Sequence, residues 1–262
     1  MREDRKRYVL ERLVDGLCTE RGVRPPATMD VDELWTAFRA LVNTRPAIPA
    51  DAEWLAMQDE LLEGLINEKG VATPDDAEVV GEDPRLRLWR GDITTLATDA
   101  IVNAANSQML GCWVPGHHCI DNAIHTYAGV QLRAECARLM EAQGTEEPTG
   151  VAKVTDAYNL PARRVIHTVG PIAGGHPTDE HRAQLASCYR SCLDLCVREG
   201  LRSVAFCCIS TGIFGFPQAE AVGIAVRTVR AWLASHDEGP LVVFNVFTAE
   251  DEALYRALLS SC

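Results

Sequence analysis

The sequence lacks long apolar runs. None of its apolar stretches approaches the roughly 20 residues that are needed to cross a bilayer. Its N-terminal sequence, MREDRKRYVL, has no apolar signal core, so we expect a protein that is not secreted and resides in the cytoplasm. In that compartment its ten cysteines are expected to be reduced thiols and not disulfides.

Basic residues are also scarce, since 25 Lys and Arg face 37 Asp and Glu and give a net charge of −12. This balance argues against duplex DNA or RNA as a partner, because no basic stripe is present to displace counterions from phosphates. A single anionic ligand is still compatible with this charge, because backbone N–H groups at the start of a helix can bind an anion without Lys or Arg. No internal repeat or low-complexity segment is visible.

The chain divides into two regions of different pattern. Residues 1–72 carry apolar side chains at the spacing of three successive helices. We expect Asp30 to cap the second helix, Arg45-Pro46 to mark the end of the second helix and Gly70 to end the third. From about Glu78 onward, short runs rich in Val and Ile alternate with helical stretches, which indicates buried strands with helices on both faces. The expected strands are Leu86–Trp89, Ala100–Val102, Val151–Thr155, Val165–Val169, Val204–Ile209 and Leu241–Val246, and the expected helices are Asp121–Met140, Glu180–Glu199, Gln218–Ser235 and Asp251–Leu259. We therefore predict a helical N-terminal extension (residues 1–77), a linker at Thr73–Asp76 and an α/β sandwich domain (residues 78–262).

One short loop concentrates potential metal ligands. Cys112, His117 and Cys119 supply two thiols and an imidazole within eight residues, and these are ligand types that zinc prefers. In an extended stretch side chains alternate between two sides, so His117 and Cys119 can face one ion while His118 points away. Three protein ligands leave a fourth position for water or substrate, as in catalytic zinc sites. The spacing alone leaves a second reading open, a Cys/His loop that binds nothing, because C-x-x-C pairs are missing.

Three further loops carry polar groups at the ends of predicted strands. Asp92 could cap the following turn or accept a hydrogen bond from a ligand amine, and Asn103 and Asn106 could make turns or bind ligand hydroxyls. The segment Ser210–Pro217 offers backbone N–H groups at a helix start, which suits a pyrophosphate, although a plain tight turn would look the same. It lacks the G-K-[S/T] of a Walker loop, which argues against an NTPase. Several other candidates are better explained as core residues: His125, Cys136, His167, Cys188, Cys192, Cys196, Cys207 and Cys208.

Five motifs together resemble those of the macrodomain family, the ADP-ribose-binding fold: RGDIT, IVNAAN, D-x-A-I-H, VIHTVGP and STGIFGFP. The resemblance covers roughly residues 84–262 and implies a three-layer α/β/α fold with a mixed central sheet. It implies that Asp92 contacts the adenine amine with the Ile93 N–H nearby, and that Phe247 lines the adenine pocket. Asn106 would hold the distal ribose. The pyrophosphate and distal ribose would be wrapped by Ser210, Thr211, Gly212, Ile213 and Phe214, in the segment that continues to Phe216.

A departure from the common family pattern narrows the resemblance. The Gly-rich run that hydrolytic macrodomains carry after NAAN is replaced here by residues 111–119, GCWVPGHHC. This segment, together with the helical extension, resembles the zinc-containing microbial branch, whose C-x4-H-x-C ligands match Cys112, His117 and Cys119.

Members of that branch reverse mono-ADP-ribosylation, and some are encoded beside a sirtuin-class transferase and a lipoyl-carrier protein. The resemblance implies a zinc-dependent hydrolase of carboxylate-linked ADP-ribose, in which Asp121 activates water or orients another group beside Asn106. Two alternatives remain at this point: a module that reads ADP-ribose without cleaving it, and a deacetylase of O-acetyl-ADP-ribose.

Overall fold

The computed structural model describes residues 1–25 and 29–261. Residues 26–28, in the region predicted as helical, and residue 262, at the end of the predicted second domain, lie outside the described residues. Within the described part of the chain, no helix has both the length and the apolar character that a membrane span requires. The described cysteines are all free thiols, as expected.

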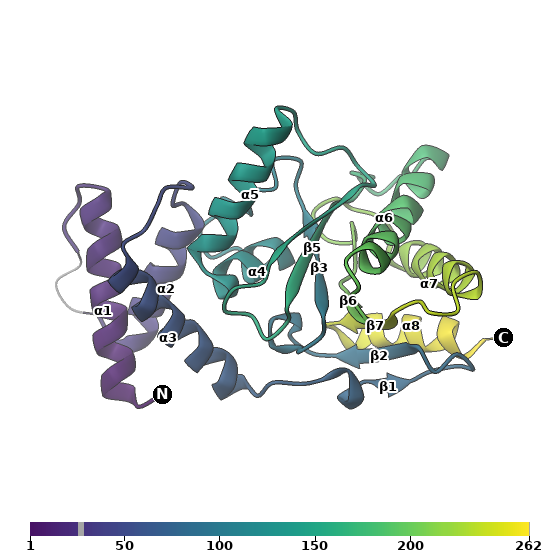
Figure 1. Ribbon diagram of the computed structural model, residues 1–262, viewed down its shortest axis with the longest axis horizontal. Helices are drawn as coiled ribbons and strands as arrows, with labels where there is room; N and C mark the ends of the chain where they lie inside the picture. Colours follow the sequence, from purple (N-terminus) through teal and green to yellow (C-terminus); the bar gives the residue numbers. More distant parts are fainter. Residues whose placement is uncertain (26–28, 262) are drawn as a thin grey trace.

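Three helices form the N-terminal extension and pack on one another: α1 (Glu3–Glu20), α2 (Val31–Asn43) and α3 (Ala52–Lys69). The predicted cap is confirmed, because the Asp30 side chain accepts the Glu33 N–H while the Glu33 side chain accepts the Asp30 N–H. Gly70 ends α3 with a φ of +86°, a conformation that costs glycine little. The three helices enclose their own apolar cluster around Leu10, Phe38 and Leu61, and Figure 1 shows them as a bundle at one end of the molecule.

A seven-stranded mixed sheet forms the centre of the second region, with the order β1-β2-β7-β6-β3-β5-β4. The five inner strands run parallel, and the edge strands β1 and β4 pair antiparallel with their neighbours. The mixed sheet is thus confirmed. The strands are β1 (Glu78–Val79), β2 (Leu86–Arg90), β3 (Ala100–Ala105), β4 (Ala152–Asp156), β5 (Arg164–Val169), β6 (Ser203–Phe206) and β7 (Leu241–Val246).

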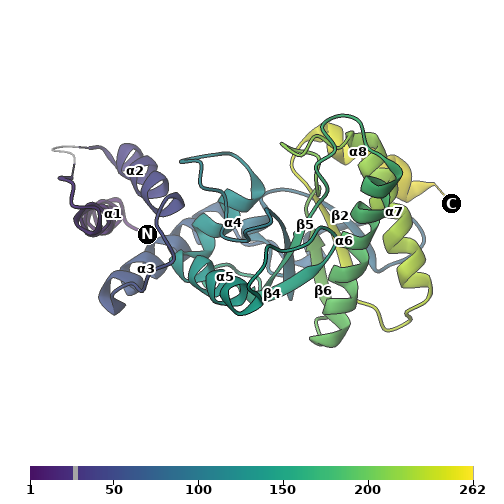
Figure 2. The ribbon, with the colours of Figure 1, turned by 90° about the horizontal axis from the view of Figure 1, so that it is seen from above.

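Helices flank the sheet on both sides. Helices α4 (Ile120–Ala128) and α5 (Val130–Gln143) lie on the side that faces the extension, whereas α6 (Asp179–Arg198) and α7 (Gln218–Ala234) lie on the other (Figures 1 and 2). The last helix, α8 (Ala249–Ser260), packs on α7, β2 and β7. The core between these layers is lined by strand residues such as Ile101, Val204 and Phe244, none of which is exposed.

Several predicted boundaries are wrong for local reasons. The predicted single helix Asp121–Met140 is two helices, because Gly129 has a φ of +96° and breaks the chain direction between α4 and α5. The predicted strand Val204–Ile209 ends at Phe206, because residues 207–216 turn out of the sheet. The two-residue edge strand β1 was not predicted, since a strand this short carries no periodicity.

The predicted linker is firmly attached to the sheet region. Residues Pro74–Asp76 form a 3-10 turn, and Ala72 bonds to both sides of the turn after β2 through the pairs Ala72 N–Thr95 O (3.0 Å) and Ala97 N–Ala72 O (2.8 Å). Ile66 of α3 also belongs to the apolar core of the sheet region. The extension therefore packs directly against the sheet region.

Candidate active site

The predicted site residues follow the carboxyl ends of four parallel strands. Asp92 and Ile93 follow β2, Asn106 follows β3, residues 210–216 follow β6, and Phe247 follows β7. Carboxyl ends of parallel strands lie at one edge of the sheet, where open α/β sheets bind their ligands. The topology thus gathers on one edge of the sheet residues that are up to 155 positions apart, from Asp92 to Phe247.

The three predicted metal ligands converge in the loop of residues 111–119, which we call the Cys/His loop. Their ligand atoms, the sulfurs of Cys112 and Cys119 and a ring nitrogen of His117, all lie within 4.8 Å of one another. Cys112 Sγ is 3.5 Å from His117 Nδ1. Cys119 caps α4, where its sulfur accepts the Asn122 N–H at 3.4 Å. His118 is not part of this cluster, as the alternation of side chains predicted.

These donors fit a tetrahedral zinc ion in type and spacing. Bond lengths of about 2.3 Å to a thiolate and about 2.1 Å to an imidazole place neighbouring ligand atoms about 3.6 Å apart, close to the separation of Cys112 Sγ and His117 Nδ1. Burial raises the pKa of the Cys119 thiol to about 12, and the nearby Cys112 adds to this rise. Two thiolates side by side therefore need a cation to be stable, which is what a bound metal would supply.

Asp121 and Asn106 lie directly beside the Cys/His loop. The Asn106 amide donates to the Gly111 carbonyl at 3.1 Å and to Asp121 Oδ2 at 3.3 Å, and Asn103 donates to Asp121 Oδ1 at 2.8 Å. Burial raises the pKa of the Asp121 carboxyl to about 6, although the Asn103 hydrogen bond and the Arg133 charge oppose this rise. Asp121 and Asn106 are thus in contact with each other, and Asn106 also bonds the first residue of the loop.

Asn103 does not lie at the surface of the predicted ligand site, where its place near the end of a predicted strand suggested it would be. The side chain is completely buried and bonds Asp121 and, at 3.2 Å, His167 Nδ1. Its expected role in binding ligand hydroxyls is therefore wrong, because side chains alternate along a strand and Asn103 points into the core. It holds the Asp121 carboxylate instead.

A second group of potential metal ligands lies deeper, formed by His125, Cys136 and His167. Their ligand atoms also lie within 4.8 Å of one another, so the group could hold a metal ion, and all three side chains are buried, as predicted for core residues. Both ring nitrogens of His167 already have neighbours at hydrogen-bond distance, Asn103 at 3.2 Å and Thr155 at 2.9 Å. Burial lowers the pKa of His167 to about 3, so this imidazole is neutral. The Cys/His loop is therefore the better candidate.

Asp92 is held by both of its carboxylate oxygens. Oδ1 accepts hydrogen bonds from the Thr94 N–H (3.0 Å) and the Thr94 hydroxyl (2.6 Å), so the capping role is confirmed. Oδ2 accepts from Lys69 Nζ at 2.8 Å. Burial would raise the pKa of Asp92, but the Lys69 and Thr94 bonds outweigh it and the pKa lies below its ordinary value. An ionised acceptor is thus fixed at this edge of the sheet.

The segment after β6 forms a compact turn. Ser210 has a φ of +66°, and the Phe216 N–H closes the turn on the Ser210 carbonyl at 2.9 Å. A neighbouring loop after β5 supports it, because Ala173 and Gly174 both donate to the Phe214 carbonyl. Ile213 and Phe247 are 77% and 76% exposed, so large apolar surfaces lie open at the two loops that are predicted to contact the ligand.

Two cations that the structure places at this site could not be predicted from the sequence. Lys69, at the end of α3, reaches Asp92 and also lies over the Tyr127 ring, 3.8 Å from its centroid. Arg133 of α5 lies over the Trp113 ring of the Cys/His loop, 4.2 Å from its centroid. A lysine near a helix end and an arginine in a helix are ordinary surface residues by pattern, so only the packing could assign them.

The fold and the arrangement of these loops define an α/β/α macrodomain, and comparison with known proteins agrees. The sequence profile described as Macro domain matches residues 102–225. A protein from Treponema medium named Protein-ADP-ribose hydrolase is 49% identical over 260 residues, which cover 98% of this chain and 99% of that protein. A protein of the same name from Staphylococcus aureus strain MRSA252 is 48% identical over 250 residues, covering 94% and 93%. The chain belongs to the macro domain family.

Solved structures show the same fold with ligands bound. A Trypanosoma brucei macrodomain in complex with ADP-ribose superposes with a TM-score of 0.63 at 32% identity and covers 84% of this chain and 94% of that one. An Oceanobacillus iheyensis macrodomain with ADPR gives a TM-score of 0.61 at 40% identity over 66% of this chain and 91% of that one.

Proposed function

We propose that this protein is a hydrolase that removes mono-ADP-ribose from modified protein side chains, with a zinc ion held by Cys112, His117 and Cys119 beside the distal ribose. The activity is suggested by relatives named Protein-ADP-ribose hydrolase that match over nearly their full length. The observation that carries the zinc site is the convergence of three zinc-type ligands, within 4.8 Å, on a loop tied through Asn106 to Asp121. Binding of ADP-ribose alone would not need this arrangement.

We assign the ends of the ligand as follows. The adenine amine donates to the Asp92 carboxylate, with the Ile93 N–H nearby and Phe247 against the ring. The pyrophosphate lies along the turn of Ser210 to Phe214, whose backbone N–H groups precede α7. The distal ribose then reaches Asn106 and the Cys/His loop. This order follows that of the strands, from β2 and β7 through β6 to β3.

Hydrolysis of a carboxylate-linked ADP-ribose consumes one water and frees the protein carboxylate. The hydroxyl group of that water joins the anomeric carbon, whose bond to the carboxylate oxygen breaks, or it joins the ester carbonyl carbon, whose bond to the ribose oxygen breaks. The remaining proton of the water must pass to a base, which in the second case returns it to the departing ribose oxygen. We assign this role to Asp121, because Asn103 and Asn106 hold its carboxylate in one orientation beside the Cys/His loop. A zinc ion bound at the loop would polarise a hydroxyl, a water or a carbonyl. Contacts to adenine and pyrophosphate would supply binding energy remote from the reaction.

Turnover of a modified protein tests this proposal. Purified protein is incubated with an automodified transferase, or with a lipoyl-carrier protein modified by a sirtuin-class transferase, and release of ADP-ribose is followed. We expect release by the zinc-loaded protein, loss after chelation and recovery on adding zinc. Asp121→Ala should bind free ADP-ribose but turn over roughly 10²–10⁴-fold more slowly. The variant His118→Ala, whose side chain lies outside the cluster, is the matched control for His117→Ala.

Tight binding without cleavage by the zinc-loaded wild type would favour a module that reads ADP-ribose. Cleavage that is unaffected by the chelator and by His117→Ala would remove zinc from the proposal but leave the hydrolase. A third substrate, O-acetyl-ADP-ribose, tests whether the same site releases acetate.

A further inference from the structure

The Cys/His loop has little hydrogen bonding of its own. Among the described residues, the one backbone hydrogen bond within residues 111–119 joins the His117 N–H to the Val114 carbonyl at 3.2 Å. A loop with so few internal bonds does not hold three ligand side chains together by itself. The partners that fix its shape therefore lie outside the loop. Asn106 and the start of α4 bond to Gly111, Val114 and Cys119, and α2 of the N-terminal extension bonds to Gly116 and His117.

Arg39 of α2 bonds to the loop at the residue that carries the imidazole ligand. Its Nη2 donates to the His117 carbonyl at 2.8 Å and to Asn122 Oδ1 at 2.9 Å. Asn122 is the residue whose N–H bonds the Cys119 sulfur. One guanidinium nitrogen thus connects the backbone of one ligand residue to the first turn of the helix that the other ligand residue caps.

Asn43, at the end of the same helix, forms hydrogen bonds to the loop and to α4 through both the oxygen and the nitrogen of its side-chain amide. Its Oδ1 accepts from the Gly116 N–H (3.0 Å) and from Asn122 Nδ2 (2.9 Å), and its Nδ2 donates to the Thr126 hydroxyl (2.9 Å). Asn43 is buried with 1% exposure. Removing this side chain would leave the buried Asn122 amide and the partly buried Gly116 N–H without these partners, and unmade hydrogen bonds are costly in such places.

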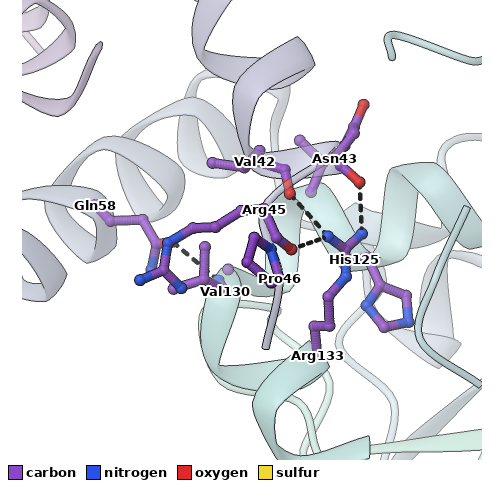
Figure 3. A pocket seen from close by; sticks show the side chains of 10 residues that line it. Val42, Asn43, Arg45, Pro46, Gln58, His125, Val130 and Arg133 are labelled. Atoms are coloured by element: carbon purple, nitrogen blue, oxygen red, sulfur yellow. Dashed lines mark hydrogen bonds between the residues drawn. The ribbon is translucent and has the colours of Figure 1, made fainter. Parts of the chain in front are cut away.

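The end of α2 is itself fixed by a residue that also contacts the loop. Figure 3 shows the Arg133 guanidinium among the carbonyls of Val42, Asn43 and Arg45, at 3.1, 2.9 and 2.6 Å. Val42 and Asn43 are the last residues of α2, where carbonyls lack the regular partner four residues on, and Arg45 lies just beyond the helix. The same guanidinium lies over Trp113 of the loop and donates to the Leu110 carbonyl just before it.

We infer that α2 is a structural part of the metal site, in which Arg39 and Asn43 are positioning residues that hold the Cys/His loop with its three ligands converged before the metal binds. This inference rests on the proposed function, because it assumes that the loop binds zinc. The inference gives the N-terminal extension a role in the metal site. Groups that orient metal ligands in this way typically change metal affinity by about 10–100-fold when they are removed.

The test compares zinc affinities of the full-length chain and its variants by competition with a chromophoric chelator. Arg39→Met keeps most of the length of the side chain but removes its donors, and Asn43→Leu removes both the oxygen and the nitrogen of the side-chain amide. We expect each variant to bind zinc about 10–100-fold more weakly than wild type. Amide hydrogen exchange of residues 111–119, measured on the metal-free protein, should become faster in both variants. Arg39→Lys, which retains a single donor group, should restore part of the affinity.

Arg21→Met is the matched control, because Arg21 also bonds the end of α2, at Leu41 and Thr44, but does not touch the loop. It should leave zinc affinity and loop exchange unchanged even if it lowers the unfolding temperature. Equal zinc affinity of wild type, Arg39→Met and Asn43→Leu would overturn the inference while the proposed zinc site stands. A wild-type chain that does not bind zinc, tested with Cys112→Ala as the null, would overturn the zinc site and this inference together.

Discussion

Individual side chains at the two ends of the proposed ligand site are held in different ways. At the proposed adenine end, Asp92 is half-exposed and keeps its charge through Lys69 and Thr94. At the proposed ribose end, Asp121 is almost fully buried, accepts hydrogen bonds from the Asn103 and Asn106 amides, lies 3.6 Å from His125 Nε2 and has a raised pKa. The first carboxylate suits a fixed hydrogen-bond acceptor and the second suits a group that exchanges protons. The two residues are thus chemically distinct although both are aspartates at strand ends.

Asp92→Ala should weaken the binding of free ADP-ribose. Loss of the acceptor leaves the adenine amine unpaired in a partly buried place, at a cost of roughly 1–3 kcal/mol, which corresponds to about one to two orders of magnitude in Kd. Calorimetric titration with ADP-ribose measures the change. Inosine-diphosphate-ribose, which lacks the amine, is the control ligand, and its affinity should change much less. An unchanged affinity for ADP-ribose would remove Asp92 from the adenine site.

Lys69→Met should make ADP-ribose binding sensitive to acid. The folded-state pKa of Asp92 lies below its ordinary value, so its ionised acceptor is present at higher pH and is lost as the pH falls through that lowered pKa. Without Lys69, the main group that opposes the effect of burial, this loss should begin at a higher pH. Because the pair is partly exposed, the effect at pH 7 should be about 2–5-fold in Kd.

Titrations with ADP-ribose between neutral pH and about pH 4.5, near the ordinary carboxyl range, check this expectation. Lys6→Met is the control, since Lys6 pairs with Glu68, the neighbour of Lys69, at 3.6 Å and does not reach Asp92. The same pH profile in both variants would contradict the proposed role of Lys69.

At the level of elements, the break between α4 and α5 determines how the extension meets the sheet region. The Gln58 side chain of α3 bonds the Val130 N–H at the start of α5 and the Gln131 side chain. The break at Gly129 brings these groups within reach, because a continuous helix would have used the Val130 N–H internally. The apolar pattern of residues 121–140 is continuous, so periodicity predicted one helix, and the close approach of α3 explains why there are two.

Gly129→Ala should destabilise the protein more than an alanine at another glycine of the same type. A Cβ at Gly129 would lie 2.5 Å from Gln58 Nε2 and 2.6 Å from Gln131 Oε1, and the φ of +96° is itself unfavourable for alanine. The matched control is Gly144→Ala at the end of α5, which has a φ of +74° but nothing within 4 Å of its Cβ. We expect about 1–3 kcal/mol of backbone strain in both, with an additional loss at Gly129 alone. Denaturant unfolding followed by circular dichroism compares the two, and equal losses would show that the contact with α3 adds nothing.

For the molecule as a whole, we propose a division into residues 1–77 and 78–262, but the two parts share a core and a site. Ile66 of α3 packs with the sheet region, and Tyr127 contacts both apolar clusters. The extension also contacts both ends of the proposed ligand site, through Lys69 at Asp92 and through Arg39 and Asn43 at the Cys/His loop. The extension therefore packs as one body with the sheet region and contributes residues to the proposed site.

The sequence alone determined the features of the structure that depend on residues close together in the chain. The buried strands, the Asp30 cap, the end of α3 at Gly70 and the grouping of Cys112, His117 and Cys119 all follow from patterns within a few positions, because backbone geometry fixes which near neighbours share a face. Only the tertiary structure decided the contacts that join distant segments: Asn103 on Asp121, Lys69 on Asp92, and Arg39 on His117, which is 78 positions away. Such pairs form only when the helices pack against the sheet. The partner of a long polar side chain cannot be predicted from sequence periodicity. The ligands of the proposed metal site are thus local in sequence, whereas the support that holds them is not.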